Sequence, residues 1–217
     1  MTSVPTRAPA GARAARMPKD QRRAQLLDAA NTVFTIRGYH AAAMDDIAEA
    51  AGVSKPVLYQ HFSSKLQLYL ALLDRSCERL VEIVAEALTS TEDNAERVTA
   101  AVGAFYDFVS SASGEFRFVF ESDLTGDNTV QKRLWRVNND IADAIAEVIA
   151  ADTALPAAEA KLLAISLVGM VQVGARFLAS KDSASIPVDQ AKRLVSQLSW
   201  RGLRSLPLIA REQTRTS

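Results

Sequence analysis

The stretch "GVSKPVLYQHFSSK", residues 52–65, decides the fold of the N-terminal part of the chain. Helical patterns over 44–51 and 55–62 are separated only by "GVS", which is the spacing of a helix-turn-helix. Gly52 can take the left-handed conformation that ends the first helix, and Pro56 is tolerated in the first turn of the second. We therefore expect two short helices that share a core and leave one face of the second exposed. The residues expected in this core are Ile47, Val53, Leu58 and Phe62.

The expected exposed face combines basic, polar and aromatic side chains at helical spacing. The residues at i, i+1, i+4 and i+5 are Lys55, Pro56, Tyr59 and Gln60. A major groove about 12 Å wide admits such a stripe, and Lys55 or Gln60 can reach base edges in it. The Tyr59 hydroxyl can bind a phosphate, and Lys65 adds positive potential at the start of the next helix. This pattern predicts that the partner is double-stranded DNA.

The charges are uneven along a chain whose formal net charge is zero. Residues 1–65 carry 9 Lys and Arg against 5 Asp and Glu, whereas residues 66–217 carry 16 against 20. The asymmetry places a polyanion-binding surface near the N-terminus. Residues 1–18 mix Pro, Ala and Arg without an apolar run, so we expect a disordered basic tail there. The arginines expected to add backbone or minor-groove contacts are Arg13, Arg16, Arg22 and Arg23.

Composition argues against an enzyme and against a secreted protein. The only cysteine is Cys77, so no intrachain disulfide can form and a reducing cytoplasm is the expected location. Two histidines, His40 and His61, no glycine-rich phosphate loop and no spaced set of metal ligands leave no catalytic constellation to assemble. We therefore expect no enzymatic activity, no cofactor and no metal. A helical interaction module that binds no DNA is one alternative.

Long segments rich in Ala, Leu, Glu and Arg with helical spacing predict an all-α protein of about nine helices. Ser54 and Ser64 can cap the third and fourth helices, and the fourth is long enough to join two modules. The expected helices cover 19–37, 44–51, 55–62, 65–88, 95–112, 115–124, 128–152, 157–180 and 188–204. The expected domains are a DNA-binding domain over 19–65, an effector-binding and dimerisation domain over 66–210 and a disordered tail over 211–217.

The block "GYHAAAMDDIAEAAGVSKPVLYQHFSSKLQLY", residues 38–69, resembles the DNA-binding domain of the TetR family of bacterial transcriptional regulators. The resemblance implies a C-terminal helical domain that binds an effector and dimerises. Family members often carry Thr and Ser where this chain has Ala42 and Ala43, so a hydroxyl cap or phosphate contact is missing there. By position, the resemblance implies that Lys55, Pro56, Tyr59, His61 and Lys65 lie at the DNA surface, with Ser54 and Gln60 beside them.

The C-terminal half contains aromatic and apolar segments that can line a cavity between helices. They include "FYDFV" at 105–109, "FRFVFESDL" at 116–124 and "LVGMVQVGARF" at 167–177. With "SWRGLRSLPL" at 199–208 and the N-terminal block, they resemble the FasR-type regulators of fatty-acid synthesis. That resemblance implies a long-chain acyl-CoA effector. The expected walls are Phe105, Phe108, Phe116, Phe120, Leu124, Val168, Val171 and Phe177, and the candidate rim cations are Arg117, Lys132, Arg133 and Arg136.

The last two helices carry apolar stripes, and the resemblance implies that they form a four-helix homodimer interface. The stripe residues are Leu162, Ile165, Gly169, Val173, Leu194, Leu198 and Trp200. Two-fold symmetry would require a roughly palindromic operator. The uncharged stretch 162–175 is shorter than a bilayer-spanning helix, so we expect a buried helix and no membrane. An alternative is a TetR-type repressor of an efflux pump that senses a drug-like hydrophobic ligand.

Overall fold

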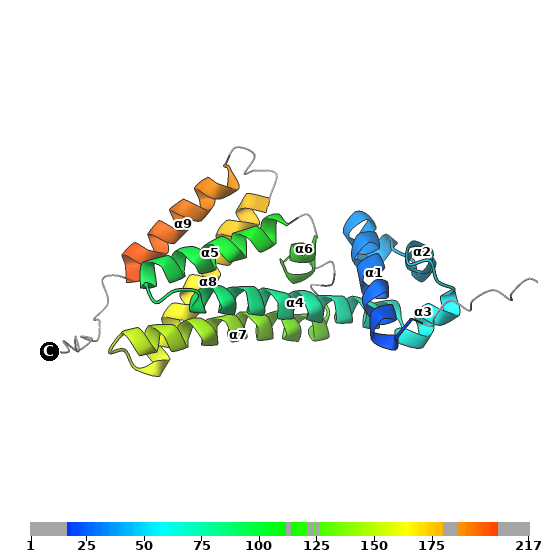
Figure 1. The fold of residues 1–217 in the computed structure, drawn as a ribbon, viewed down its shortest axis with the longest axis horizontal. Helices are drawn as coiled ribbons and strands as arrows, with labels where there is room; N and C mark the ends of the chain where they lie inside the picture. Colours follow the sequence, from blue (N-terminus) through cyan, green and yellow to red (C-terminus); the bar gives the residue numbers. More distant parts are fainter. Residues whose placement is uncertain (1–16, 112–113, 121–123, 125, 180–185, 204–217) are drawn as a thin grey trace, which may run out of the picture.

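The computed structural model describes residues 17–111, 114–120, 124, 126–179 and 186–203, and these residues form an all-helical fold (Figure 1). Helices α1 to α3 lie at one end of the long helix α4, and the remaining helices gather around the rest of α4. The expected N-terminal and C-terminal tails lie outside the described residues, apart from Met17 and Pro18. The helices are α1 (Lys19–Ala41), α2 (Met44–Ala50), α3 (Lys55–His61), α4 (Lys65–Thr89), α5 (Asn94–Ser110), α6 (Glu115–Phe120), α7 (Asn128–Asp152), α8 (Ala157–Ala179) and α9 (Val188–Leu203).

Helix α1 packs across α2 and the start of α4. It buries five apolar residues on one face, among them Leu26 and Phe34. The sequence predicted an end at Gly38, and the backbone there does leave helical geometry, with φ 73°. One further turn follows before the chain becomes extended at Ala42, so α1 is kinked at Gly38 instead of ending there.

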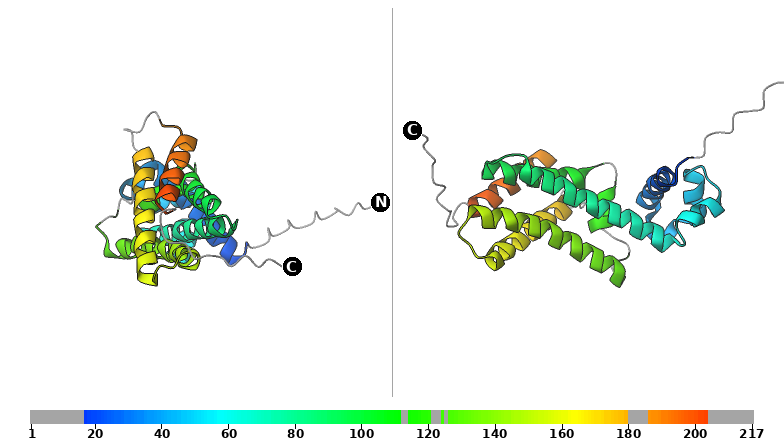
Figure 2. Two further views of the ribbon diagram at one scale, coloured as in Figure 1. Left: turned by 90° about the vertical axis from the view of Figure 1, so that its left-hand side faces the viewer. Right: turned by 60° about the horizontal axis from the view of Figure 1, so that its bottom comes forward.

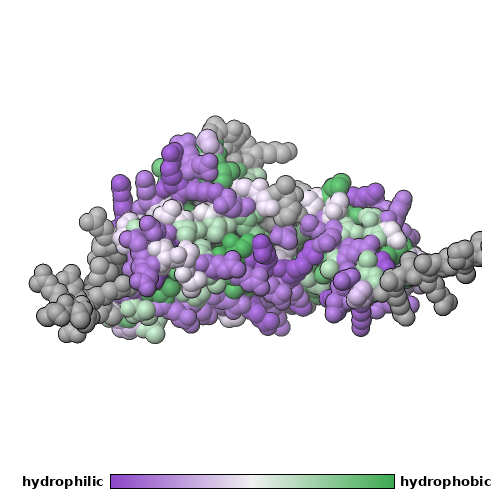
Figure 3. Space-filling model, in the orientation of Figure 1, coloured by the Kyte–Doolittle hydropathy of each residue, from purple (hydrophilic) through white to green (hydrophobic). Residues whose placement is uncertain are grey.

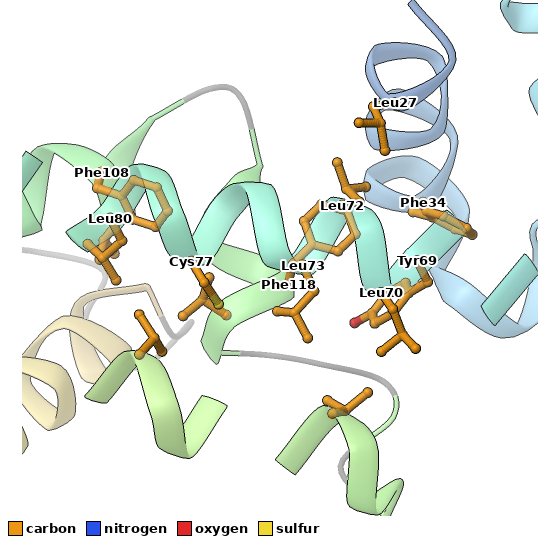
Figure 4. Packing of buried hydrophobic residues seen from close by; sticks show 14 of the residues in the cluster. Leu27, Phe34, Tyr69, Leu70, Leu72, Leu73, Cys77, Leu80, Phe108 and Phe118 are labelled. Carbon is orange, nitrogen blue, oxygen red and sulfur yellow. The ribbon is translucent and has the colours of Figure 1, made fainter. Parts of the chain in front are cut away.

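Helix α4 belongs to both parts of the protein. Its first turn is capped as expected, because the Ser64 hydroxyl accepts a hydrogen bond from the backbone N–H of Gln67 at 3.2 Å. Figure 4 shows Tyr69 of α4 beside Phe34 of α1, and their ring centroids are 5.6 Å apart. Phe118 of α6 joins them, with its ring 5.6 Å from Tyr69. Farther along, α4 packs against α5 and α7.

The other helices form the C-terminal bundle. Asp93 and Asp127 cap α5 and α7 through side-chain bonds to backbone N–H groups. Helix α7 packs on both α4 and α8, whereas α5 packs between α4 and α9. The left view of Figure 2 shows α8 and α9 together at the end of the molecule opposite α1 to α3. Figure 3 shows a mostly hydrophilic surface along α4 and α7.

Helix α8 is more exposed than the sequence analysis expected. Within the described residues it is the one helix long and apolar enough to cross a membrane, judged by length and composition, yet 22% of its most apolar window is buried. The predicted burial therefore holds for one side only: that side of α8 packs on α7, while the other side carries an apolar stripe. The exposed apolar residues of this stripe on α8 and α9 are Leu162, Ile165, Val173, Phe177, Leu194 and Leu198.

Candidate nucleic-acid interface and ligand cavity

The turn between α2 and α3 is built as the sequence predicted. Gly52 has φ 63°, and nothing lies within 4 Å of the position where a Cβ would stand, so backbone conformation alone favours glycine here. The N–H of Val53 donates to the carbonyl of Ala48 at 2.9 Å and closes the turn. Ile47 and Leu58 are completely buried between the two helices. This packing fixes the orientation of α3 and the side chains on its outer face.

The outer face of α3 presents the predicted stripe to solvent. Tyr59 is 42% exposed, so its ring and hydroxyl are open to solvent on this face. His61 is half-buried at the edge of this face. The predicted cap is wrong, because the Ser54 side chain makes no capping hydrogen bond and stays exposed. The exposed residues of the stripe are Ser54, Lys55, Pro56, Tyr59 and Gln60.

Lys55 forms an ion pair with Asp45, and a DNA group can take the place of Asp45. Its ammonium lies 2.8 Å from a carboxylate oxygen of Asp45, and the two side chains are 55% and 68% exposed. The hydrogen bond and the charge of Asp45 raise the pKa of Lys55. Ion pairs this exposed contribute little to stability, so exchanging Asp45 for a base edge or a phosphate costs little.

Lys65 has an internal role that the sequence did not indicate. Its ammonium donates to the backbone carbonyls of Tyr39, His40 and Ala42 at 2.8, 3.3 and 2.9 Å. It also lies 4.5 Å from the ring centroid of Tyr39. An ammonium has three donors, and these bonds use all of them. In this structure Lys65 therefore fastens the end of α1 to α4, and it is not positioned as the phosphate contact we predicted.

Asp46 takes over part of the role of the hydroxyl side chains that are missing at Ala42 and Ala43, before α2. The carboxylate of Asp46 accepts a hydrogen bond from the N–H of Ala43 at 3.0 Å and also pairs with Arg37 at 2.6 Å.

The arginines predicted to contact the DNA backbone are only partly described by the structure. Among them, Arg23 stacks over the ring of Phe62 at 4.4 Å. The remaining arginines of that set are Arg22, which donates to Gln25, and Arg13 and Arg16, which lie outside the described residues.

The C-terminal bundle contains an apolar cavity of about 110 Å³ that is partly open to its surroundings. Of the eight expected wall residues, Phe105, Val168 and Val171 line it. Phe108 is buried beside α4 (Figure 4) but does not line the cavity, and Phe177 is 51% exposed. Leu124 also lies away from it, and the side chains at 116 and 120 are outside the described residues. The lining residues are Val84, Leu88, Asn94, Arg97, Val98, Ala101, Val102, Phe105, Ile141, Ile145, Val148, Ile149, Asp152, Thr153, Leu167, Val168, Val171, Ser199 and Trp200.

A partly buried ion pair that the sequence analysis missed lies at the wall of this cavity. Arg97 lies 3.0 Å from the carboxylate of Asp152, and their side chains are 18% and 11% exposed. Arg97 also donates to the carbonyl of Thr91 at 2.7 Å and to the side chain of Asn94 at 3.0 Å. The available signal was a charged residue beside the apolar positions 98, 101, 102 and 105 of α5.

The predicted rim cations lie elsewhere. Lys132, Arg133 and Arg136 do not line the cavity, and Arg133 pairs with Asp74 at 2.6 Å. The side chain of Arg117 is outside the described residues. Trp200 was assigned to the dimer stripe but lines the cavity instead, because α9 turns that side chain inward.

A helix-turn-helix joined by a long helix to a bundle with an apolar cavity defines a ligand-responsive DNA-binding protein. Residues 26–72 match the sequence profile of the bacterial regulatory proteins of the tetR family. The chain is 46% identical over 202 residues to the HTH-type transcriptional activator FasR of Mycolicibacterium smegmatis, an alignment that covers 92% of each chain.

Solved structures share the fold. A TetR-like transcriptional regulator from Rhodococcus sp. RHA1 is 30% identical with a TM-score of 0.64, covering 88% of this chain and all of its own. FadR from Bacillus subtilis in complex with stearoyl-CoA has a TM-score of 0.66 at 16% identity, covering 81% of this chain and 96% of its own. The chain belongs to the TetR family of bacterial regulators and is a DNA-binding transcriptional regulator, not an enzyme.

Proposed function

We propose that this protein controls genes of fatty-acid biosynthesis in the cytoplasm and that a long-chain acyl-CoA bound in the C-terminal bundle sets its affinity for DNA. The similarity to FasR supports this proposal, because it extends over both the helix-turn-helix and the cavity. The stearoyl-CoA complex of FadR supports it more weakly, since at 16% identity that protein shares the fold alone. No cofactor is needed for this activity.

The observation that carries the proposal is that α4 touches both functional parts. Near its start, Tyr69 packs on Phe34 of the DNA-binding end. Fifteen and nineteen residues later, Val84 and Leu88 of the same helix line the cavity. A ligand that pushes on the far end of a helix moves its near end as well, because a packed helix transmits displacement instead of absorbing it.

The size of the cavity favours a ligand-driven change. Ligand sites commonly enclose about 300–1,000 Å³, and the cavity here has about 110 Å³. A long acyl chain therefore needs more room than this partly open pocket offers, and we expect the surrounding helices to separate when it binds. Since α4 forms one wall, this separation would change the distance between the recognition helices of a dimer.

The apolar stripe on α8 and α9 supports homodimerisation. Its side chains are large and exposed, for example Leu162 and Val173 at 64% and Leu198 at 61%. Covering such a stripe with a second copy removes apolar area from water and creates two-fold symmetry. The two α3 helices would then read a roughly palindromic operator.

The test combines ligand binding with DNA binding. Fluorescence anisotropy with labelled fatty-acid synthase promoter DNA is measured during titration with palmitoyl-CoA, oleoyl-CoA, acetyl-CoA and cationic drugs. We expect long-chain acyl-CoA to change the operator affinity, acetyl-CoA to leave it unchanged, and Tyr59→Ala to abolish sequence-specific binding. Glu147→Gln, an exposed change on α7 away from both α3 and the apolar stripe, serves as the control.

Other outcomes point to the alternatives. A response to cationic drugs and not to acyl-CoA would favour a repressor of an efflux pump. Unchanged DNA affinity of Tyr59→Ala would overturn the recognition surface itself. Two structures with and without acyl-CoA that show equal separation of the α3 helices would remove the proposed coupling.

A further inference from the structure

A carboxylate stands on the surface that α3 offers to DNA. Asp45 belongs to the first turn of α2, and its Oδ1 and Oδ2 atoms lie 2.8 and 3.2 Å from the ammonium of Lys55, the first residue of α3. In helix-turn-helix proteins the N-terminal residues of the recognition helix contact base edges in the major groove. The base atoms that meet the Lys55 ammonium therefore also lie close to the Asp45 carboxylate.

The fold itself makes little use of Asp45. Its side chain is 68% exposed, and Lys55 is its ion-pair partner among the described residues. The hydrogen bond that caps the start of α2 comes from the neighbouring carboxylate of Asp46 instead. An exposed ion pair such as Asp45–Lys55 contributes little to stability.

Against DNA, by contrast, the Asp45 carboxylate has a large effect. Phosphates carry the same sign of charge and offer acceptors, so they cannot replace the water that the carboxylate loses on docking. The bases do offer donors in the major groove, namely the N4 amino group of cytosine and the N6 amino group of adenine. A carboxylate at this position is therefore tolerated where a base places an amino group beside it.

The edge of a G·C pair matches both side chains at once. Guanine presents the acceptors O6 and N7, and cytosine presents its N4 amino donor. O6 and N4 are hydrogen-bonded to each other within the pair and so lie about 2.9 Å apart. The separation between Nζ of Lys55 and Oδ1 of Asp45 is 2.8 Å. An ammonium has three donors and a carboxylate two oxygens, so Lys55 can donate to guanine and Asp45 can accept from cytosine without separation of the ion pair.

The orientation of the base pair matters, because the two side chains come from different helices and cannot exchange places. In the reversed pair the carboxylate faces O6 and N7, and the ammonium faces the amino group. A T·A pair keeps the acceptor O4 for Lys55 and the donor N6 for Asp45, but thymine has its C5-methyl group where guanine has N7. Written with the base that faces Lys55 first, the expected order of affinity is G·C, then T·A, then A·T and C·G.

We infer that Asp45 and Lys55 together read one G·C pair in each operator half-site, with guanine on the side of Lys55 and cytosine on the side of Asp45. Asp45 is the specificity residue of the two, because it penalises every base pair that lacks a donor at its position. The inference rests on the DNA binding of the family and is independent of the effector that we propose.

The test measures how affinity depends on each base pair of the operator. The full chain first selects its operator from a pool of random DNA duplexes, and each base pair of one half-site is then replaced by the other three. Competition against the labelled operator in fluorescence anisotropy gives the relative affinities. For the wild type we expect one position that prefers G·C and loses at least about tenfold in affinity when the pair is reversed.

Asp45→Ala is the informative variant. At that position the penalty for the reversed pair should fall several-fold, while the preferences at the other positions stay as in the wild type. Affinity for unrelated DNA should rise and its salt slope should steepen by about 1, because Lys55 is no longer neutralised. Glu49→Ala is the matched control, since Glu49 is an exposed acid one turn farther along α2. This control removes the same charge and should leave the base preference at every position unchanged.

Three results would overturn the inference. One is a folded Asp45→Ala protein with the wild-type base preferences, and another is an equal change in Glu49→Ala, which would show an effect of net charge alone. The third is uniform weakening at all positions together with a lower Tm, which would make Asp45 a structural residue.

A second variant keeps the test decisive if Asp45→Ala does not fold. The amide of Asp45→Asn can donate as well as accept, so this protein should also tolerate the reversed pair, and an unchanged penalty would overturn the inference. The relative affinities compare DNA sequences for one state of the protein. A failed response to acyl-CoA would therefore refute the proposed function and leave the base reading intact.

Discussion

Replacing Lys65 by alanine tests whether this residue serves the fold or the DNA. The change removes three hydrogen bonds to the carbonyls of Tyr39, His40 and Ala42 and the contact with the Tyr39 ring. Hydrogen bonds from a charged group contribute about 1.5–3 kcal/mol each when buried. The site is half-buried, so water can solvate the released carbonyls and much of this is recovered. We expect a net loss of about 2 kcal/mol in the free energy of unfolding.

A loss of that size is measurable. For a chain of 150–250 residues, 1 kcal/mol shifts Tm by about 2–4 °C, so Lys65→Ala should lower Tm by about 4–8 °C in calorimetry. Lys55→Ala is the matched control, since it removes a lysine from the same surface that holds only an exposed ion pair. It should leave Tm almost unchanged while weakening operator binding and reducing the salt slope by about 1. A Lys65→Ala protein with wild-type Tm and the DNA defect of Lys55→Ala would refute the structural assignment.

Three further predictions concern the bundle. Gly174→Ala places a Cβ 2.7 Å from the hydroxyl of buried Tyr106 and should destabilise by about 1–3 kcal/mol in urea unfolding. Gly103→Ala meets nothing within 4 Å and should stabilise by about 0.5–1 kcal/mol, so equal effects of the two changes would contradict the packing. Burial raises the pKa of Cys77 to about 12, so the thiol should resist maleimide at pH 8 until the protein unfolds, and rapid labelling of the native state would argue against it. Backbone hydrogen bonds from Val130 and Thr129 lower the pKa of Asp127, so its stabilisation is complete above the unfolded pKa near 3.8 and is lost as the pH falls through the folded pKa. Asp127→Asn should therefore flatten the acid side of the stability profile, and an unchanged profile would count against the cap.

The helix boundaries show which features of the fold can be predicted from neighbouring residues alone. The predicted ends of α2, α3, α5 and α8 agree with the structure to within one or two residues, because caps and helix breakers act on the backbone next to them. Ser64 behaves as predicted, whereas Ser54 occupies the same kind of position without forming the bond. A serine before a helix therefore indicates the boundary more reliably than it indicates the hydrogen bond.

The candidate sites show the same difference between what local spacing predicts and what tertiary packing decides. The exposed face of α3 was predictable, since residues on one short helix share a face through its periodicity alone. The walls of the cavity were predicted in part: Phe105 lines it and Phe177 does not, although both stand in aromatic, apolar segments. Which side of a helix faces the cavity depends on its neighbours, and the sequence does not state which helices those are.

The sequence by itself determined the helix-turn-helix, the helix order and the family, because these depend on glycine, proline and apolar spacing within short stretches. Only the tertiary structure decided the roles of Lys65 and Arg97. Lys65 meets carbonyls 23 to 26 residues away, and Arg97 meets Asp152 at a separation of 55 residues. A lysine or arginine has the same charge at any position, and its function is set by the partners that long-range packing brings within hydrogen-bond distance.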